Sequence, residues 1–313
     1  MPIYNYVNEV QKKVEERLTH ESVTEGLFSK QYSFSGVRTI TTKNVENVAL
    51  TPYDRTLTEG GKAGTIGNRF GDIHELASTT NEYTMLHEVK YNLGWDKGAN
   101  TDEHEIRTAS SVISRQDREI IVPYRDKYRL MRLAEGAGLK KYGLSSASTG
   151  ELSRKNIVET LLKARAEMAN NFVPIGKQVL YIGETAAIEM KLADLVVGSD
   201  ILSEKPIVNG ELMKLGGFQL KIVPDSYFDW TDINANITAA NNGQTTVNGN
   251  LGFLIVTKGC GWSPVKVKTS RVDTTPSNFD GTQILYHEYF DCFVNKTRNV
   301  CVYAGWTSAD PNG

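Results

Sequence analysis

The sequence predicts an α+β protein, because helical and strand-like patterns occupy separate stretches of the chain. The longest helical pattern covers residues 110–135, and a second one covers residues 154–170. Residues 251–313 instead contain four strand-like stretches in succession, and residues 34–95 alternate between apolar and polar side chains. Successive strands joined by short turns pair in antiparallel sheets, so we expect a sheet at the C-terminal end of the chain.

Composition and charge exclude several classes of protein. The 313 residues include 35 Lys or Arg and 37 Asp or Glu, for a formal net charge of −2, and 40% of the residues are hydrophobic. This balance excludes a strongly basic nucleic-acid binder and an acidic solvating tail. The N-terminal sequence lacks a signal-peptide pattern, and no apolar run reaches the roughly 18 residues that span a bilayer. We therefore expect a soluble cytoplasmic protein whose cysteines, Cys260, Cys292 and Cys301, are reduced and mostly buried.

The N-terminal region has the spacing of an amphipathic helix over residues 3–18. Its apolar stripe consists of Ile3, Val7, Val10, Val14 and Leu18. Two interpretations remain open: a helix packed on its own core, or an arm that lies on a neighbouring subunit. A capping-box pattern at residues 22–25 predicts a further short turn, which Gly26 limits.

A long β-hairpin is predicted for residues 34–95. Its first arm lies within residues 34–50 and its second within residues 82–93, where apolar and polar side chains alternate. The tip between the arms is polar and contains a cluster of glycines together with Lys62 and Arg69. So long a loop in a compact domain indicates a function or a projection away from the core.

The predicted long helix over residues 110–135 is interrupted by Pro123, which indicates either a kink or the start of a new helix. Between residues 112 and 141 there are eight Lys or Arg against four Asp or Glu. The following helix, residues 154–170, has Ser153 as its predicted N-cap and one apolar face. That face consists of Ile157, Leu161, Ala164 and Met168.

The remaining chain alternates between strands, one helix and loops. We predict a strand at 177–182, a helix at 184–196 and a pair of strands within 212–223. The asparagine-rich stretch 234–250 has the composition of a loop around Asn242-Gly243. Four further strands are predicted at 252–257, 265–272, 283–294 and 299–306.

Motifs that carry catalysis are absent from the sequence. Each of the five histidines is followed by glutamate, but none continues to the His-Glu-x-x-His pattern of a metalloprotease. His87 lies within an alternating strand, so we interpret it as a structural histidine. The acidic segment 101–105 is interpreted as a solvated loop, with a divalent-cation site as the alternative. We therefore predict no enzyme activity, no metal and no cofactor.

The order of the segments resembles that of the major capsid proteins of tailed bacteriophages, the Hong Kong 97-type fold, which encapsulins share. Residues 37–55 (VRTITTKNVENVALTPYDR) and 82–96 (EYTMLHEVKYNLGWD) resemble the two arms of that family's extended E-loop. Asp102-Glu103 before a helix that runs into VPYRDKY (122–128) resembles the entry to its spine helix. Residues 253–257, 286–294 and 300–304 resemble its last peripheral-domain strands.

The resemblance implies an organisation of the whole chain. Residues 1–33 would form an N-terminal helical arm and residues 34–95 the extended E-loop hairpin. Residues 96–150 and 251–313 would form the peripheral domain with its long spine helix, and residues 151–250 the axial domain at the centre of hexamers and pentamers. Two departures are that the arm begins at Met1, with no room for a long scaffolding segment, and that no crosslinking Lys/Asn pair can be assigned.

The resemblance also implies a function: a structural subunit that assembles itself into an icosahedral head around double-stranded DNA. Its implied partners are other copies in hexamers and pentamers, scaffolding, portal and decoration proteins, and DNA bound non-specifically on the inner face; no membrane is involved. The implied location is the virion, with assembly in the cytoplasm of the bacterial host. We predict that inter-subunit contacts include Val10, Val14, Arg55, Lys62 and Arg69.

Two other functions remain open from the sequence. One is an encapsulin-type shell that encloses an enzyme cargo in a bacterium. The other is an oligomeric enzyme whose site residues come together only in three dimensions.

Overall fold

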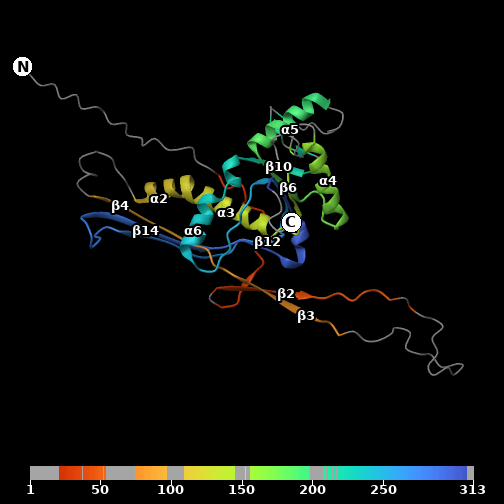
Figure 1. Ribbon diagram of the computed structural model, residues 1–313. Helices are drawn as coiled ribbons and strands as arrows, with labels where there is room; N and C mark the ends of the chain where they lie inside the picture. The colour runs from red at the N-terminus through yellow and green to blue at the C-terminus, as the bar shows by residue number, and fades with distance from the viewer. Residues whose placement is uncertain are drawn as a thin grey trace, which may run out of the picture. The chain divides into compact units, whose positions relative to one another are not determined.

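A computed structural model describes most of the chain, in two compact units (Figure 1). The described residues are 21–36, 38–51, 53, 75–96, 109–144, 152, 156–197, 207–208, 211–212, 214–215 and 218–308. The smaller unit is Tyr32–Thr84, and the larger one combines Met1–Gln31 with Met85–Gly313.

The smaller unit is a three-stranded antiparallel sheet in the order β1-β2-β3. Its strands are β1 (Ser33–Phe34), β2 (Thr39–Val45) and β3 (Ser78–Thr84). The register of β2 and β3 runs from Thr39 opposite Thr84 to Val45 opposite Ser78. Threonine is frequent in both strands, and its branched side chain favours extended backbone.

The second predicted hairpin arm is divided between two sheets. β3 pairs with β2, whereas β4 (Glu88–Asp96) pairs with β14 (Gly281–Phe290) in the larger unit. Apolar and polar residues alternate from Tyr83 to Tyr91 with Leu86 as the one exception, and this pattern does not indicate that the pairing partner changes.

A six-stranded sheet forms the centre of the larger unit, in the order β5-β16-β11-β6-β10-β9. Its strands are β5 (Leu139–Lys141), β16 (Val302–Trp306), β11 (Leu251–Thr257), β6 (Gln178–Gly183), β10 (Phe218–Val223) and β9 (Lys214–Leu215). Every residue of β6, β11 and β16 is buried, because helices cover both faces of the sheet. These strands, and the antiparallel pair β9-β10, confirm the predicted strands in this region.

Two hydrophobic cores lie on opposite faces of this sheet. Along β6, Val179 belongs to one core and Leu180 to the other, as the alternation of a strand requires. Helices α3 (Val122–Glu135) and α6 (Thr231–Ala240) pack on the first face, and α4 (Ile157–Asn170) and α5 (Glu184–Val197) on the second (Figure 1). The predicted apolar face of α4 is buried as expected.

The long helix is continuous through Pro123. It consists of α2 (Ala109–Gln116), a π-helical turn η2 (Asp117–Ile121) and α3. Proline has no N–H to donate and its ring crowds the carbonyl four residues earlier. The wider π turn immediately before Pro123 relieves that conflict, which explains why neither a sharp break nor a separate helix forms.

A second, three-stranded antiparallel sheet lies beside α2, in the order β13-β14-β4 (Figure 1). β13 (Val265–Asp273) pairs with β14 along nearly its whole length. The remaining elements are short: β12 (Gly261–Trp262) with β15 (Phe293–Val294), β7 (Ile207–Val208) with β8 (Glu211–Leu212), η3 (Asp225–Phe228) and η4 (Lys296–Cys301). Among the described helices, none is long and apolar enough to cross a membrane.

The prediction of a loop throughout residues 234–250 was wrong, because α6 includes Asn234 and Asn236. Asn234 bonds both backbone groups of Val247: its Nδ2 donates to the carbonyl at 2.8 Å and its Oδ1 accepts from the N–H at 3.1 Å. The helix is held by that contact and by the burial of Ile233 and Ile237, neither of which composition reveals.

Candidate functional site

Three buried carboxylates lie on helix α3 or accept hydrogen bonds from its side chains. Asp126 and Glu288 are fully buried and Asp291 is 1% exposed. The same helix supplies a row of arginines, Arg125, Arg129 and Arg132. Their spacing of four and three residues places them on one side of a helix. Burying a carboxylate is unfavourable unless it is paired and hydrogen-bonded. The pairs between these carboxylates and the side chains of α3 therefore fix the position of the helix.

Glu288 joins the three-stranded sheet to α3. Nη2 of Arg125 donates to its Oε1 at 2.6 Å, and the Tyr286 hydroxyl donates to its Oε2 at 2.8 Å. Burial raises the pKa of Tyr286, so its hydroxyl remains a donor. The Tyr286 ring also stacks on Tyr91 of the adjacent strand, with 4.8 Å between centroids. The helix-facing side of the sheet is therefore fixed by one ion pair and one aromatic pair.

Asp126 anchors the chain that follows the N-terminal region. It accepts hydrogen bonds from Ser22 Oγ at 2.8 Å, Val23 N at 2.7 Å and Thr24 Oγ1 at 2.5 Å. Ser22 and Thr24 belong to the predicted capping-box pattern at residues 22–25, and their hydroxyls bind α3. The short turn predicted there is present, because Leu27 N donates to the Thr24 carbonyl at 3.3 Å. Tyr181 OH donates to the Val23 carbonyl at 2.9 Å, which attaches the same segment to β6.

Asp291 holds the chain where the smaller unit continues into the larger one. Its carboxylate accepts from Tyr128 OH at 2.6 Å and from the backbone N–H groups of Leu86 at 2.9 Å and Cys292 at 2.7 Å. Burial raises the pKa of Asp291, an effect that Arg132, 3.9 Å away, opposes.

Residues 85–87, here called the hairpin anchor, directly follow β3. Tyr289 OH donates to the Met85 carbonyl at 2.7 Å, and the Asn242 amide donates to the Leu86 carbonyl. His87 stacks on Tyr128, with 3.9 Å between ring centroids. Every residue of the anchor is thus bound by groups distant in sequence.

His87 is confirmed as a structural histidine. Its ring is 3% exposed; Nε2 lies 3.1 Å from Tyr124 OH and Nδ1 lies 3.4 Å from Gln244 Oε1. Burial lowers the pKa of His87 to about 4, partly offset by its contact with Gln244. The imidazole ring is therefore neutral at pH 7, and its burial is favourable only while it remains neutral.

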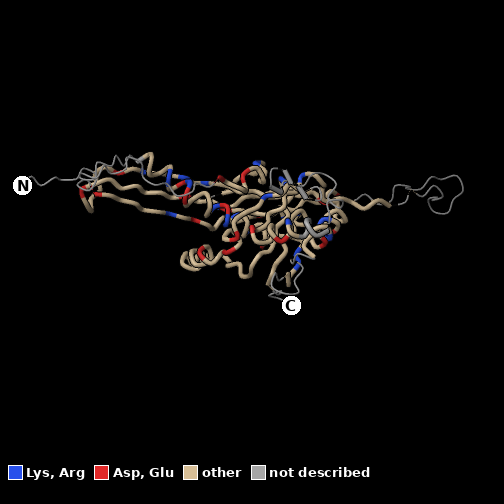
Figure 2. The backbone as a smooth tube through the Cα atoms, turned by 90° about the horizontal axis from the view of Figure 1, so that it is seen from above, with Lys and Arg blue, Asp and Glu red and all other residues tan. Residues whose placement is uncertain are grey.

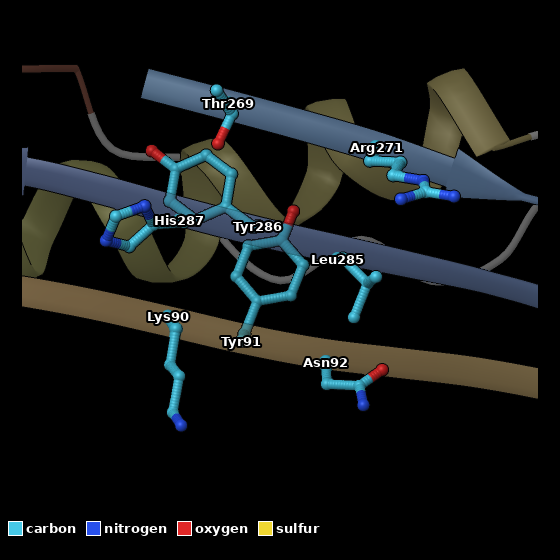
Figure 3. A pocket seen from close by; sticks show the side chains of 8 residues that line it. All are labelled: Lys90, Tyr91, Asn92, Thr269, Arg271, Leu285, Tyr286 and His287. Carbon is cyan, nitrogen blue, oxygen red and sulfur yellow. The ribbon is translucent and has the colours of Figure 1, made fainter. Parts of the chain in front are cut away.

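The opposite face of the three-stranded sheet carries a shallow cavity of about 550 Å³ (Figure 3). The side chains that share this face by the strand register are Lys90, Asn92, Thr269, Arg271, Leu285 and His287. Tyr91 and Tyr286 also border the cavity, although their stacked rings belong to the helix-facing side. The strand register places Lys90 opposite His287 and Arg271 opposite Leu285, so their side chains share one face. An open surface with two cationic side chains, one amide and one leucine suits contact with another molecule and contains no nucleophile paired with a base.

Charges of both signs are interspersed along the larger unit (Figure 2). Three arginines of the basic stretch 112–141 lie against buried carboxylates. Arg125 pairs with Glu288 and Arg132 lies near Asp291. Nη1 of Arg129 lies 3.8 Å from Oδ1 of Asp126. Sequence reasoning missed these carboxylates; the regular spacing of the arginines on one helix was the only available signal.

The predicted contact residues Val10, Val14, Arg55, Lys62 and Arg69 all lie outside the described residues, as does the acidic segment 101–105. Within the described part of the chain, no group of His, Cys, Asp and Glu is arranged to hold a metal ion. Cys260 and Cys292 are buried and Cys301 is partly exposed. Burial raises the pKa of Cys260 to about 12, so this thiol is protonated and unreactive.

This arrangement, a spine helix beside a long antiparallel sheet, a covered central sheet and a separate hairpin unit, is the Hong Kong 97-type capsid fold. Solved structures from phages share it over nearly the whole chain. One from Mycobacterium phage Che8 has a TM-score of 0.67 at 13% identity, covering 97% of this chain and 98% of that chain.

Two further structures agree. The capsid structure of the cyanophage P-SCSP1u has a TM-score of 0.69 at 12% identity and covers 98% of this chain and 94% of that one. The acid-stable capsid structure of Helicobacter pylori bacteriophage KHP30 has a TM-score of 0.66 at 11% identity, covering 99% and 98%. No protein-family model and no curated protein matches the chain. At these identities the similarity lies in the fold.

Proposed function

We propose that this chain is the major capsid protein of a tailed bacteriophage, which assembles into the icosahedral head that encloses double-stranded DNA. The observation that carries the proposal is the extent of the structural similarity. It covers 97–99% of this chain and 94–98% of the three phage chains compared above. A similarity that includes the hairpin unit, the spine helix and both sheets is more specific than one confined to a common core.

The smaller unit supports assembly on physical grounds. A small sheet of this kind buries too little apolar surface to be stable alone, and its outer strands β1 and β3 are edge strands, which can pair with another chain. Contact with a neighbouring subunit would satisfy both needs. Many such contacts of modest strength add up in a closed shell, because each subunit takes part in several at once.

The role that we propose is structural, without catalysis or a cofactor. The partners would be other copies in hexamers and pentamers, with scaffolding, portal and decoration proteins, and DNA held non-specifically. A net charge of −2 suits a wall around packaged DNA, since a strongly basic lining would bind phosphates tightly. The location would be the virion, after assembly in the host cytoplasm.

The domain boundaries and contact residues from the sequence remain part of this proposal. They are the arm 1–33, the hairpin 34–95, the peripheral domain 96–150 with 251–313, and the axial domain 151–250. Val10, Val14, Arg55, Lys62 and Arg69 would lie at inter-subunit contacts.

Negative-stain electron microscopy of the purified full chain, expressed alone and concentrated, tests the proposal. We expect closed shells, tubes or rings of capsomers. Shells filled with a host enzyme would instead identify a cargo compartment of the encapsulin type. Uniform small particles at every concentration, also after co-expression with the neighbouring phage genes, would contradict the proposal.

A further inference from the structure

The C-terminal end of α4 carries an unusual residue. The helix closes with two hydrogen bonds, from Val173 N to the Met168 carbonyl at 3.1 Å and from Phe172 N to the Ala169 carbonyl at 3.0 Å. These two bonds define a Schellman motif, and its accompanying apolar contact is present because Val173 and Met168 are both buried in the same core. The motif places Phe172 at the position that glycine usually occupies.

Phe172 has a backbone φ of +58°, in the left-handed region. That conformation crowds a side chain against the backbone and costs roughly 1–2 kcal/mol for most residues. Among the described residues, the other positive-φ positions are seven glycines and Asn241, residue types that tolerate this conformation. A bulky residue there is a true outlier, and such strain tends to persist where it serves a function.

The Phe172 side chain gains nothing within its own subunit. It is 95% exposed, and Ile175, three residues further on, is 57% exposed. Phe172 thus combines two features that are unfavourable for the stability of the isolated subunit: a strained backbone conformation and an aromatic ring exposed to water. The core contacts of the turn come from Val173, so a glycine at position 172 would close α4 equally well.

We propose that Phe172 and Ile175 form an apolar knob that packs against a neighbouring copy of this chain in the assembled shell. The inference rests on the proposed function and adds a specific contact to it. An aromatic side chain offers roughly 150–250 Å² of surface, well below the roughly 800 Å² that each partner buries in a stable interface. The knob therefore suits one contact among several in a multivalent assembly and is too small to hold a separate partner protein.

The surroundings of the knob argue for protein and against a lipid surface. Glu167 and Asn170 on the last turn of α4 and Lys177 after the turn are all exposed. A carboxylate beside an apolar tip opposes insertion between anionic lipid headgroups, which attract clusters of basic side chains. Exposed carboxylate, amide and ammonium groups that flank the apolar residues in sequence instead match the ordinary polar rim of a protein interface.

The test compares Phe172→Gly and Phe172→Leu with the wild-type full chain. Phe172→Gly removes both the strain and the ring, so the urea midpoint of the unassembled subunit should rise while the yield of particles falls about tenfold or more. Phe172→Leu keeps the strain and an apolar side chain, and should assemble at close to the wild-type yield. As a matched control, Asn241→Gly changes the second non-glycine residue with positive φ among the described residues, and it should leave the particle yield unchanged.

The two possible failures are distinguishable. Equal yields from the wild type and Phe172→Gly would overturn the knob while leaving the capsid function intact. A fall in the urea midpoint of Phe172→Gly would also overturn it, because the ring would then be packing within its own subunit. If the wild type forms no particles, also after co-expression with the neighbouring phage genes, the proposed function is contradicted. The knob is then tested by sedimentation velocity, and equal self-association of the wild type and Phe172→Gly overturns it.

Discussion

Replacing Arg125 with methionine is the sharpest test of how the spine helix is held. Arg125 is the residue that donates to the fully buried Oε1 of Glu288, at 2.6 Å. Methionine is of comparable length and keeps the apolar contacts of the arginine stem, so the main loss is the positive charge.

The expected cost follows from the burial of Glu288. Removing one partner of a buried ion pair leaves an uncompensated charge and typically destabilises by about 3–5 kcal/mol. Glu288→Gln removes that charge and keeps an acceptor for Tyr286 OH. The double variant Arg125→Met/Glu288→Gln should therefore be more stable than Arg125→Met alone, with a coupling free energy of about 2 kcal/mol.

Urea unfolding of the unassembled chain, followed by tryptophan fluorescence, measures these effects. Trp230, Trp262 and Trp306 are buried in the larger unit and report its unfolding. Lys163→Met is the matched control, because its ion pair with Glu159 on α4 is well exposed and should contribute nothing measurable. A cost below about 1 kcal/mol for Arg125→Met, additive with that of Glu288→Gln, would refute this account of the pair.

Three further predictions concern the anchor, the hairpin and the arm. His87 has a folded-state pKa of about 4, below its unfolded value of 6.5, so the stability from its neutral burial is present above pH 6.5 and is lost as the pH falls towards 4. Between about pH 7.5 and about pH 4.5 the wild type should therefore lose roughly 2–3 kcal/mol more than His87→Gln in urea titrations, and parallel losses would contradict the burial argument. Deleting residues 58–68 should leave a folded subunit, judged by circular dichroism, that closes no shells; normal shells would refute the bridging role of the hairpin. Val10→Asp with Val14→Asp should reduce particle yield more than subunit solubility, whereas insoluble protein would indicate an ordinary core helix.

The elements that sequence reasoning predicted well are those stabilised by their own periodic pattern. The stripe from Ile157 to Met168 predicted α4 and its buried face, because apolar residues repeated on every helical turn form one continuous face that packs on the core. The strand predicted at 177–182 is β6, and its apolar run at residues 179–182 is covered on both faces in the structure.

The elements that it missed depend on residues far away in the chain. Asn234 lies in a helix because its amide binds Val247, and composition cannot reveal that contact. The alternating stretch after Tyr83 changes partner at the hairpin anchor because Asp291 and Asn242 bind Leu86 there. Long-range hydrogen bonds of this kind override local propensity.

The buried carboxylates illustrate the same limit for the candidate site. An acidic residue in a strand, such as Glu288, looks solvent-exposed in sequence, since charged side chains are rarely buried unless paired. Only its position opposite Arg125 makes burial possible. Phe172 is similar: its aromatic character predicts burial, and the end of α4 exposes it.

Cryo-electron microscopy of particles assembled from the full chain would show whether this chain builds a capsid. We expect an icosahedral shell built from rings of five and six copies, with this fold in each subunit and the Tyr32–Thr84 hairpin lying on a neighbour. A closed oligomer of a few copies, in which that hairpin contacts only its own subunit, would contradict this expectation.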